Sequence, residues 1–354
     1  MFAIFGIDQT EVIDAIDCAI CRSDWMRLIL KYIRFILCAS AKMWEGKDVT
    51  IPIKRTIFFV RALMASHSLR PFLNAPSDKS LGKLLQQRPQ IIGVVVWSYQ
   101  CTAWNAKTRL AKIVDHCSVM DEIGRPLDFP VDSYIELLGL SEIYQGLRVI
   151  ISQPAWLFRD GLLTMHLFDS TQMIYSLSFS FFHHGNDRAA FIGQIQGEKS
   201  DRARGRYREL TRVCGGMRPR DLLIEIFCIF CSTIAVKHVF SVAEEYRRQR
   251  YRYFFKNGNK VTSANYNTIW EDQGGVAADK LSYRLDVERR RRSDRSIGAS
   301  KRRMYRRRFA MLDRIEAQMH ERLLLPLICR HEESDPFTQT LLAVSNVRSQ
   351  PYQK

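Results

Sequence analysis

Hydrophobic positions in the first quarter of the chain recur every three or four residues, which is the spacing of helices. Between Trp25 and Cys38, one side of the predicted helix carries Leu28, Tyr32, Phe35 and Ile36. Another side carries Arg27, Lys31 and Arg34. This amphipathic pattern predicts either a helix packed on a core or a helix lying on a membrane surface. We therefore expect residues 1–88 to be helical and to end in a connector over residues 73–88.

The pattern changes at Pro89, after which β-branched residues and alternating positions become common. Residues 91–97 are predicted to form a strand, residues 104–117 a helix and residues 147–151 a strand. Three more strands are expected over residues 162–168, 173–182 and 189–196, separated by polar turns. In the middle one, Leu177, Phe179 and Phe181 alternate with serines, which predicts a strand with one buried face.

Two adjacent glycines, Gly215 and Gly216, form a loop before the next predicted element. An arginine-rich polar link over residues 200–213 leads into this loop. A buried helix is expected from Pro219 to about Ile234, because proline suits the first helical turn and the run is apolar on nearly every side. A strand at residues 238–242 follows. These elements predict an α+β fold with a mixed, mainly antiparallel central sheet and packed helices.

The last third of the chain is predicted to contain a short helix at residues 266–273, a strand at 281–287 and a long helix at 301–325. The long helix has an apolar stripe made of Tyr305, Phe309, Leu312, Ile315, Met319 and Leu323. The predicted domains are a helical region at 1–88, an α+β domain at 89–325 and a poorly ordered tail at 326–354.

The chain is strongly basic, because its 354 residues carry a formal net charge of +16. Its hydrophobic content of 46% is that of a folded protein rather than a disordered one. The charge is clustered, since residues 286–310 hold eleven Lys or Arg and three Asp or Glu. This clustering predicts a polyanionic partner, which is nucleic acid, an anionic membrane face or a phosphorylated ligand. Simple solubility is the alternative explanation.

The nine cysteines are odd in number and scattered, which argues against a disulfide framework. Cys18–Cys21 and Cys228–Cys231 have CxxC spacing, but both pairs lie in apolar helical runs without histidine nearby. We therefore predict buried thiols and no metal site. The amino terminus lacks the pattern of a secretory signal, and no apolar run reaches the roughly 20 residues that span a bilayer. These features predict a cytoplasmic protein, with peripheral contact to the inner membrane face left open.

The glycine loop is the first candidate binding site. Glycines let the backbone turn sharply and approach a ligand closely, and the start of a helix presents free N–H groups to an anion. Flanking arginines supply charged donors to a phosphate. The predicted anion or cofactor site consists of Arg212, Gly215, Gly216, Arg218 and Arg220, with Gln194 and Gln196 lining the cleft. A plain strand-to-helix connection is an equally good interpretation of this loop.

Two arginine-rich segments are candidates for polyanion binding. The segment YRRQRYRY at 246–253 interleaves arginine with aromatic rings, a pattern that stacks on bases or holds phosphates. The segment SKRRMYRRRF at 300–309 places six basic residues on the long helix. The predicted polyanion-binding residues are Arg247, Arg248, Arg250, Arg302, Arg303, Arg306, Arg307 and Arg308. For the first segment, the alternative is an amphipathic stretch with tyrosines in the core and arginines in water.

No catalytic residue can be assigned from the sequence. The acidic residues nearest the basic segments are Glu244, Glu245, Glu271 and Asp272. They would act as a general base or, more commonly, neutralise nearby arginines. His183 and His184 lie in a predicted turn without Cys or His at ligand spacing, so a solvent-exposed pair is expected.

Five motifs in the same order resemble the VirK/YbjX family of Gram-negative bacteria. They are FIGQIQG (191–197), TRVCGGMRPRDLL (211–223), YRRQRY (246–251), YNTIWEDQGG (266–275) and SKRRMYRRRFAMLD (300–313), and the resemblance covers about residues 89–313. It implies an accessory protein tied to virulence, to surface display of a virulence protein and to resistance against cationic antimicrobial peptides. It implies no catalytic residues, because no molecular activity is established for the family. Cys214 and Glu244 stand at or near positions where the family commonly has histidine.

Two classes of function remain. One is an acyltransferase-like enzyme, because the order of hairpin, strand, glycine loop, buried helix and strand resembles the acyl-CoA N-acyltransferase fold, in which this loop holds a pyrophosphate. An acyl-CoA-type ligand would then be the cofactor. The other is a non-catalytic module that binds RNA or anionic lipid. An open gap between parallel strands beside Gly215 would favour the enzyme, and a closed sheet with positive surface elsewhere would favour the module.

Overall fold

The chain divides into two compact units in a computed structural model of the whole protein. The structure describes residues 24–46, 48–154, 157–170, 172–198, 203–248, 265–288, 298–325 and 329–331. Unit 1 comprises residues 1–97 with 105–114, and unit 2 comprises residues 98–104 with 115–354. The three-part division expected from the sequence stays a prediction. Cys18–Cys21, Arg250 and the tail after Glu332 lie outside the described residues.

Unit 1 is helical. Its elements are α2 (Asp24–Met43), α3 (Ile51–Met64), α4 (Ser66–Leu73), α5 (Ser80–Gln87), the 3₁₀ helix η2 (Pro89–Val95) and α6 (Ala106–Ile123) up to Val114. The largest fully buried side chains of this unit are Phe58, Ile36, Leu69 and Ile91. The helical character predicted for the amino-terminal region is confirmed over the described residues. Leu28 departs from the predicted packed side of α2, because it is 52% exposed.

The strand predicted over residues 91–97 is wrong, because η2 and the turn after it occupy this segment. The spacing of a short apolar run cannot distinguish a buried strand from a buried helical turn. Gly93 permits the helical path, since a Cβ on it would lie 2.5 Å from the ring of Trp97. The connector expected over residues 73–88 also contains a helix, α5, whose Gly82 lies against the backbone of Pro76.

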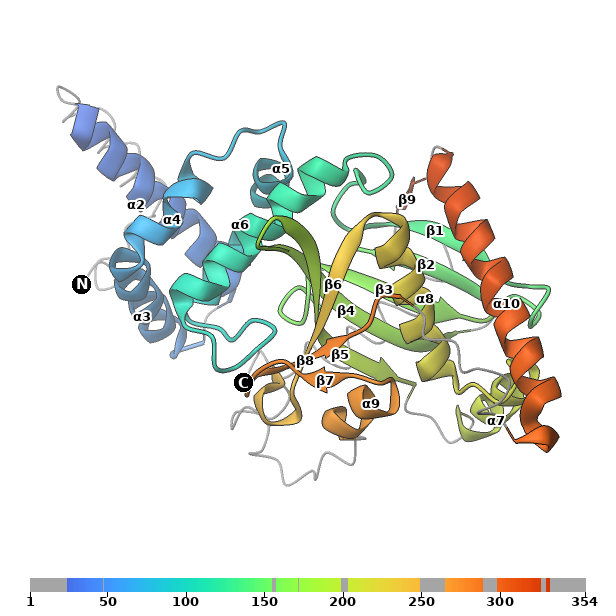
Figure 1. Cartoon of the computed structure of the whole chain (residues 1–354). Helices are drawn as coiled ribbons and strands as arrows, with labels where there is room; N and C mark the ends of the chain where they lie inside the picture. Colours follow the sequence, from blue (N-terminus) through green and yellow to red (C-terminus); the bar gives the residue numbers. More distant parts are fainter. Residues whose placement is uncertain are drawn as a thin grey trace. The chain divides into compact units, whose positions relative to one another are not determined.

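Unit 2 is built on a sheet that has nine strands within the described residues, in the order β7-β8-β6-β5-β4-β3-β2-β1-β9 (Figure 1). The strands are β1 (Ser133–Gly139), β2 (Arg148–Ser152), β3 (Leu163–Phe168), β4 (Met173–His184), β5 (Asp187–Gly197), β6 (Val236–Val242), β7 (Val276–Ala277), β8 (Ser282–Leu285) and β9 (Cys329–His331). Neighbouring strands are antiparallel except β5 and β6, which run parallel. The predicted mixed, mainly antiparallel sheet is therefore confirmed.

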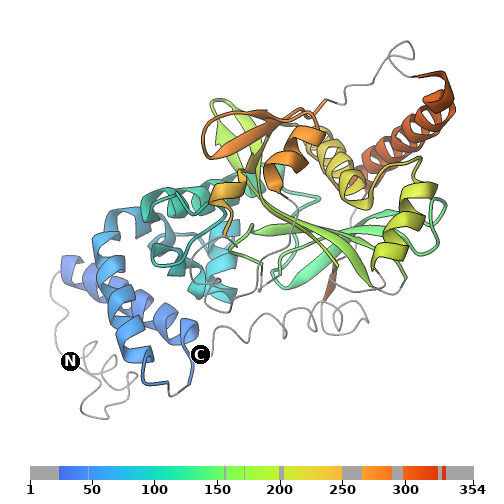
Figure 2. The same cartoon turned by 90° about the horizontal axis from the view of Figure 1, so that it is seen from below.

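Helices cover one face of this sheet. α8 (Pro219–Thr233) packs on β4 and β6, and α10 (Ala299–Leu324) packs on α8 and β1 (Figure 2). The predicted long carboxy-terminal helix is thus confirmed. The polar link expected over residues 200–213 is wrong, because α7 (Ala203–Val213) occupies most of it. Arginine is a good helix former, and Tyr207 and Leu210 give α7 an inner side.

β4 alternates as predicted, but both of its faces are buried. Phe179 packs under α8, where its ring centroid lies 4.7 Å from that of Phe227. The serines on the other face, Ser176, Ser178 and Ser180, are at most 2% exposed. The prediction of a half-buried strand is therefore wrong, and the serine face is a polar layer inside unit 2.

Candidate functional site

The one parallel strand pair among the described residues separates before β5 ends. β6 pairs with β5 from Arg188 opposite Val236 as far as Ile192 opposite Ser241. β5 then continues to Gly197, paired only with β4. Gly193 begins this stretch, and a Cβ on it would lie 2.1 Å from the carbonyl oxygen of Asp160, so glycine is required there. Residues 193–197 therefore present an edge to which β6 does not pair.

The side chain of Tyr266, the first residue of α9 (Tyr266–Asp272), closes this edge at Ile195. Its hydroxyl donates a hydrogen bond to the Ile195 carbonyl oxygen at 2.8 Å and accepts one from the Ile195 N–H at 3.0 Å. Burial raises the pKa of Tyr266 to about 12, so the phenol keeps its proton at neutral pH. One side-chain hydroxyl thus satisfies the two backbone groups that a neighbouring strand would normally satisfy.

A buried ion pair holds Tyr266 in place. Glu244 Oε1 lies 3.0 Å from the guanidinium of Arg247, and both side chains are 4% exposed. Glu244 Oε2 accepts a hydrogen bond from the backbone N–H of Tyr266 at 2.9 Å. The Arg247 guanidinium carbon lies 4.7 Å from the centroid of the Tyr266 ring. Glu244 therefore neutralises a nearby arginine, which is the commoner of the two roles expected for it.

Arg248 is also buried and paired, in this case with Asp160. Its Nε donates to Asp160 Oδ1 at 2.7 Å, and its Nη2 bonds to Asp160 Oδ2. Arg247 and Arg248 thus lie inside unit 2, each matched by a carboxylate. Among the other acidic candidates, Asp272 Oδ2 lies 3.5 Å from Arg220, while Glu271 accepts from the Tyr283 hydroxyl at 3.1 Å.

Seven polar side chains from β2 to β5 line the sheet face that points away from α8. We call this set the polar row, and it consists of Ser152, Thr164, His166, Ser176, Ser178, Gln194 and Gln196. The register places them opposite one another, with Ser178 across from Gln194 and Ser176 across from Gln196. All except Gln196 are at most 6% exposed. Burial lowers the pKa of His166 to about 3, so its ring is neutral at physiological pH.

The polar row is only partly satisfied by its own members. Thr164 bonds to Ser178 at 3.1 Å, and Gln194 Nε2 donates to Gln196 Oε1 at 2.7 Å. Among its serine and glutamine side chains, three atoms have no hydrogen-bond partner in the described residues: Ser176 Oγ, Gln194 Oε1 and Gln196 Nε2. Buried polar atoms in native proteins almost always have a partner, such as an ordered water or a ligand. The row therefore offers one donor, one acceptor and one hydroxyl to a bound molecule.

The glycine turn, residues 214–218, lies under the start of α10. Gly215 and Gly216 have φ of +62° and +76°, a left-handed conformation that favours glycine. Arg308 on α10 donates to the Gly215 carbonyl oxygen from Nε at 3.2 Å and from Nη2 at 3.0 Å. A Cβ on Gly216 would lie 2.9 Å from the sulfur of Met304. Side chains of α10 therefore fill the space next to these two glycines.

The start of α8 lies next to the end of β5. Arg218 is its N-cap residue and makes no side-chain capping bond. Burial raises the pKa of Tyr175, and the charges of Arg220 and Arg218 oppose that shift, so both arginines lie near Tyr175. Tyr175 itself pairs with Gly197, the last residue of β5. The amino end of a helix and two arginines therefore lie near the end of β5, an arrangement that suits an anion. Arg220 is paired with Asp221 at 2.8 Å and lies 3.5 Å from Asp272 of α9, the helix whose Tyr266 closes the β5 edge.

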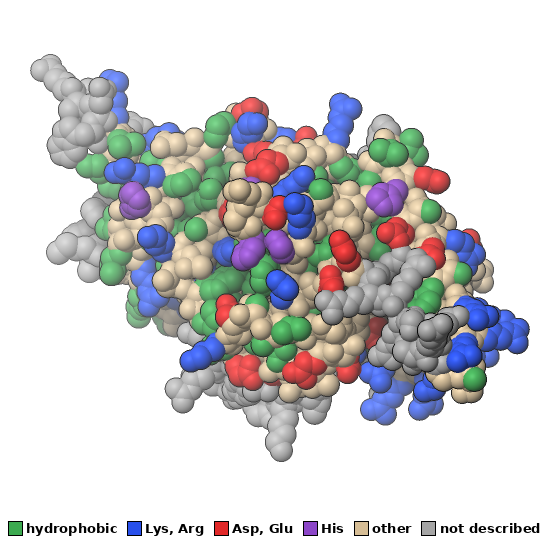
Figure 3. All heavy atoms as spheres, in the orientation of Figure 1, with side chains coloured by type: hydrophobic (Ala, Val, Ile, Leu, Met, Phe, Trp, Pro, Cys, Tyr) green, Lys and Arg blue, Asp and Glu red, His purple; other side chains and the backbone are tan. Residues whose placement is uncertain are grey.

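Basic side chains gather on the surface formed by α7 and the first turns of α10 (Figure 3). The exposed ones on α10, which we call the α10 basic cluster, are Lys301, Arg302, Arg303, Arg306 and Arg307. The first fourteen residues of α10 contain no Asp or Glu. Arg212 in the last turn of α7 and Arg218 on the glycine turn are also exposed. This surface is a candidate for binding polyanions.

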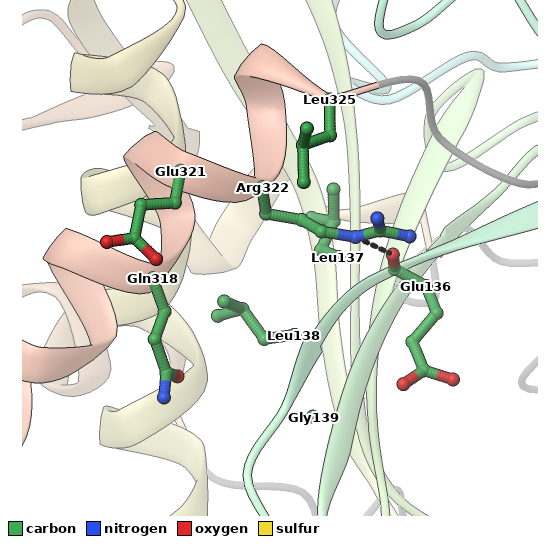
Figure 4. A pocket seen from close by; sticks show the side chains of 8 residues that line it. All are labelled: Glu136, Leu137, Leu138, Gly139, Gln318, Glu321, Arg322 and Leu325. Carbon is green, nitrogen blue, oxygen red and sulfur yellow. Dashed lines mark hydrogen bonds between the residues drawn. The ribbon is translucent and has the colours of Figure 1, made fainter.

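A pocket of about 310 Å³ lies between β1 and the end of α10 (Figure 4). Its lining consists of Glu136, Leu137, Leu138, Gly139, Gln318, Glu321, Arg322 and Leu325. Arg322 crosses it, with Nε 3.4 Å from the Glu136 carbonyl oxygen. None of the site residues predicted from the sequence lines this pocket, and the sequence analysis did not predict β1.

The histidines and cysteines outside these sites are accounted for by local contacts. His183 bonds through Nδ1 to Asp115 and through Nε2 to Glu122 at 2.9 Å, so it is not the free surface histidine expected. Cys228 and Cys231 are buried in α8, and burial raises their pKa values. Across the described parts of the chain, no group of three His, Cys, Asp or Glu side chains is placed to hold a metal ion. In the same parts, no helix has the length and apolar character needed to cross a bilayer.

The structure brings some predicted site residues together and separates others. Arg218 and Arg220 lie at the end of β5, whereas Gln194 and Gln196 lie on the sheet face away from α8. No hydrogen bond or ion pair between described residues joins the glutamines to these arginines. Sequence reasoning missed Tyr266, although it is the first residue of the motif YNTIWEDQGG.

Comparison with known proteins identifies relatives but no activity. The family profile described as "Protein of unknown function (DUF535)" matches residues 51–321. "Uncharacterized protein YbjX" of Escherichia coli (strain K12) is 35% identical over 296 residues, which cover 80% of this chain and 86% of that protein. "Membrane protein LapB" of Mannheimia haemolytica is 23% identical over 198 residues, which cover 52% of this chain and 84% of that protein. No solved structure matches the chain at a significant level.

Proposed function

The chain belongs to the DUF535 family and is a relative of YbjX, and from this premise we propose that it binds a phosphate-bearing ligand of the acyl-CoA type. The membership agrees with the resemblance to the VirK/YbjX family carried by the five sequence motifs. One observation carries the proposal: β5 leaves β6 at Ile192, and Arg220 at the amino end of α8 contacts α9, the helix whose Tyr266 covers the edge that this exposes.

The order of elements supports this proposal. Antiparallel strands lead to β5, α8 crosses to the parallel strand β6, and β8 returns beside β6 with β7 outside it. The sequence analysis compared the central part of this order with the acyl-CoA N-acyltransferase fold. Likeness of fold does not by itself fix a reaction, so the argument depends on the site.

Each part of the site has a role under this proposal. Arg218, Arg220 and the first free N–H groups of α8 would hold the phosphates. The backbone N–H and carbonyl groups of Ile195 would pair with an amide of the ligand, which requires the Tyr266 hydroxyl to move away from them. The polar row would meet the acyl group or its acceptor through Ser176, Gln194 and Gln196. The proposal names no catalytic residue.

Calorimetric titration of the full chain with acetyl-CoA, coenzyme A and pantetheine tests this function. We expect acetyl-CoA and coenzyme A to bind, and we expect pantetheine, which lacks the phosphates, to bind more weakly. Arg218→Ala should weaken coenzyme A binding by about tenfold, because a hydrogen bond to a charged group contributes about 1.5–3 kcal/mol. Arg284→Ala is the matched control, since Arg284 is an exposed arginine on β8.

Two results would count against the proposal. The first is the absence of heat with either coenzyme A compound while the protein is folded by circular dichroism. The second is equal affinity for coenzyme A in the wild type and in the Arg218→Ala/Arg220→Ala variant. If pantetheine instead binds as tightly as coenzyme A, the edge of β5 holds the ligand without the arginines.

A second function, binding of RNA or anionic lipid, is favoured by the α10 basic cluster and the exposed Arg212 and Arg218. Such binding releases counterions, so affinity should fall steeply as salt rises. Changing Arg303 and Arg307 to Glu should weaken it at least tenfold, whereas changing Arg284 to Glu should not. An interaction that does not depend on salt would remove this candidate.

We also propose that the activity serves the bacterial envelope. The name of the Mannheimia relative, "Membrane protein LapB", is consistent with this setting. The VirK/YbjX resemblance implies support for virulence factors at the cell surface and resistance to antimicrobial peptides. Under this proposal the protein works in the cytoplasm, at the inner face of the membrane. Cell fractionation with and without high salt tests the location.

A further inference from the structure

Helix α3 of unit 1 has two apolar faces, and only one of them is packed. Its buried side chains are Ile51, Phe58 and Ala62. Five aliphatic side chains on the helix are exposed: Ile53 by 63%, Ile57 by 49%, Val60 by 50%, Leu63 by 44% and Met64 by 83%. All except Leu63 follow one another in steps of four, three and four residues, which places these four in a single stripe. We call Ile53, Ile57, Val60 and Met64 the α3 stripe.

Basic residues flank this stripe. α3 carries no Asp or Glu and has Lys54 and Arg61 on the side next to the stripe. Figure 3 shows Lys and Arg side chains between hydrophobic ones over this helix. Residues 24–46 and 48–97 together contain eleven Lys or Arg and four Asp or Glu. One of these acids, Asp48, has its Oδ2 3.9 Å from Lys54 Nζ.

The size and charge of this surface fit a lipid bilayer better than a protein. A stable protein interface takes about 20–30 residues from each partner, far more than one helical stripe supplies. Helices that lie in the headgroup region combine an apolar stripe with basic flanks, and each flanking Lys or Arg adds about 1 kcal/mol on an anionic surface. With 14 residues, α3 is about 21 Å long and cannot span a bilayer.

We propose that unit 1 docks on an anionic membrane surface through the α3 stripe, with the helix lying parallel to the bilayer. Ile53, Ile57, Val60 and Met64 enter the boundary between headgroups and acyl chains, while Lys54 and Arg61 remain among the phosphates. This site shares no residue with the proposed coenzyme A site or with the α10 basic cluster. It supplies hydrophobic insertion, which neither of those surfaces offers.

Co-sedimentation of the full chain with vesicles tests the proposal. We compare vesicles of phosphatidylcholine containing 30% phosphatidylglycerol with vesicles of phosphatidylcholine alone, both at about 0.15 M salt. We expect binding to the anionic vesicles, and we expect Ile57→Glu and Met64→Glu each to weaken it about tenfold or more by removing buried aliphatic area and adding a negative charge. The matched control is Val276→Glu on β7, which changes a valine that is 69% exposed in unit 2 and should leave binding unchanged. Thermal unfolding monitored by circular dichroism checks that the variants are folded.

Other outcomes would overturn the proposal. If the wild type does not bind anionic vesicles, the stripe does not dock on lipid. If Ile57→Glu and Val276→Glu bind alike, or if only Arg303→Glu/Arg307→Glu loses binding, the membrane contact belongs to α10. If sedimentation shows a wild-type dimer that Ile57→Glu dissociates, and vesicle binding is unaffected, the stripe is an interface with a second copy.

Discussion

The hydroxyl of Tyr266 lies 2.8 Å from the carbonyl oxygen of Ile195 and 3.0 Å from its nitrogen, across 71 positions of sequence. If β5 and β6 had continued to pair, a residue of β6 would lie opposite Ile195. The Tyr266 hydroxyl takes that place instead. The backbone groups of Ile195 are therefore paired with a side chain and not with a strand. A side chain can rotate away, whereas a strand cannot leave unless the sheet unfolds. Under the proposed function, one residue therefore links the stability of the protein to the access of a ligand to this edge.

Removal of that hydroxyl should destabilise the fold. Tyr266→Phe leaves the Ile195 N–H and carbonyl buried without this partner, which costs about 1–3 kcal/mol for each unsatisfied group. We expect the urea midpoint to fall measurably. The matched control is Tyr283→Phe, whose hydroxyl bonds to Glu271 at the surface and should contribute little. If both variants unfold at the same urea concentration, the Tyr266 hydroxyl does not hold the edge of β5.

The same change should increase affinity for an acyl-CoA-type ligand if the ligand pairs with Ile195. Phenylalanine cannot compete for the Ile195 backbone groups, so the ligand no longer has to displace a hydroxyl. Coenzyme A binding that is tighter in Tyr266→Phe than in wild type, measured by calorimetry, would support this. Unchanged affinity would place the ligand elsewhere than on the β5 edge.

Loss of the charge on Glu244 should be more damaging. Glu244 balances buried Arg247 at 3.0 Å and fixes the start of α9 through the Tyr266 N–H. Breaking a buried pair on one side costs about 3–5 kcal/mol, so Glu244→Gln should lower the free energy of unfolding by an amount near that range. Glu245→Gln, which changes the exposed neighbour bonded to Asn267, is the control. The double variant Glu244→Gln/Arg247→Gln should recover part of the loss, and no recovery would mean that the two residues act independently.

The glycine turn should resist substitution because of α10. Gly216→Ala places a Cβ in a left-handed conformation and 2.9 Å from the Met304 sulfur. Gly185→Ala has a similar φ of +62° but nothing within 4 Å of the new Cβ. The control should therefore cost about 1 kcal/mol from the backbone alone, and Gly216→Ala should cost more in urea unfolding. Equal losses would show that the Met304 side chain moves aside freely.

Local patterns in the sequence predicted the sheet and the long helix, but they could not predict which residues contact one another in the interior. The alternation in β4 indicated which residues share a face, yet it could not show that a second layer covers the serines. Serine is found both in contact with solvent and in buried polar layers, so its presence does not show whether this face of β4 is exposed or buried. Residues 91–97 illustrate the same limit, because η2 depends on how Gly93 meets Trp97 and not on hydrophobicity.

Counting the arginines in a segment does not show which of them are buried and paired. Arg247 has its partner Glu244 three positions away, so that pair was open to prediction from spacing. Arg248 pairs with Asp160, 88 positions away, and no local pattern reports such a contact. Both arginines look like surface residues in the sequence. On α10, Arg302, Arg303, Arg306 and Arg307 are exposed as expected, whereas Arg308 is half-buried against Gly215. Charge counting thus located a basic surface correctly in α10 and overestimated it in residues 246–248.

His183 should make stability depend on pH. It lies between Asp115 and Glu122 of α6, and its cross-strand neighbour is Arg188. Its hydrogen bond to Asp115 is the main cause that raises its pKa above the ordinary value, with the Glu122 bond adding to it. A raised pKa in the folded state stabilises the protein fully below the unfolded value of about 6.5, and this contribution disappears as pH rises through the folded pKa.

The melting temperature of His183→Gln should therefore fall furthest below that of the wild type near pH 6, and the difference should shrink by pH 9. His320→Gln, on the exposed side of α10, is the control and should show no such trend. His116 works in the opposite direction, because burial lowers its pKa to about 3 and its contribution is lost as pH falls from about 6.5 toward that value. Because His116 is present in both proteins, its contribution cancels in the difference between His183→Gln and the wild type. A difference between His183→Gln and wild type that stays constant from pH 6 to pH 9 would mean that the imidazole is held by its neutral hydrogen bonds and not by its charge.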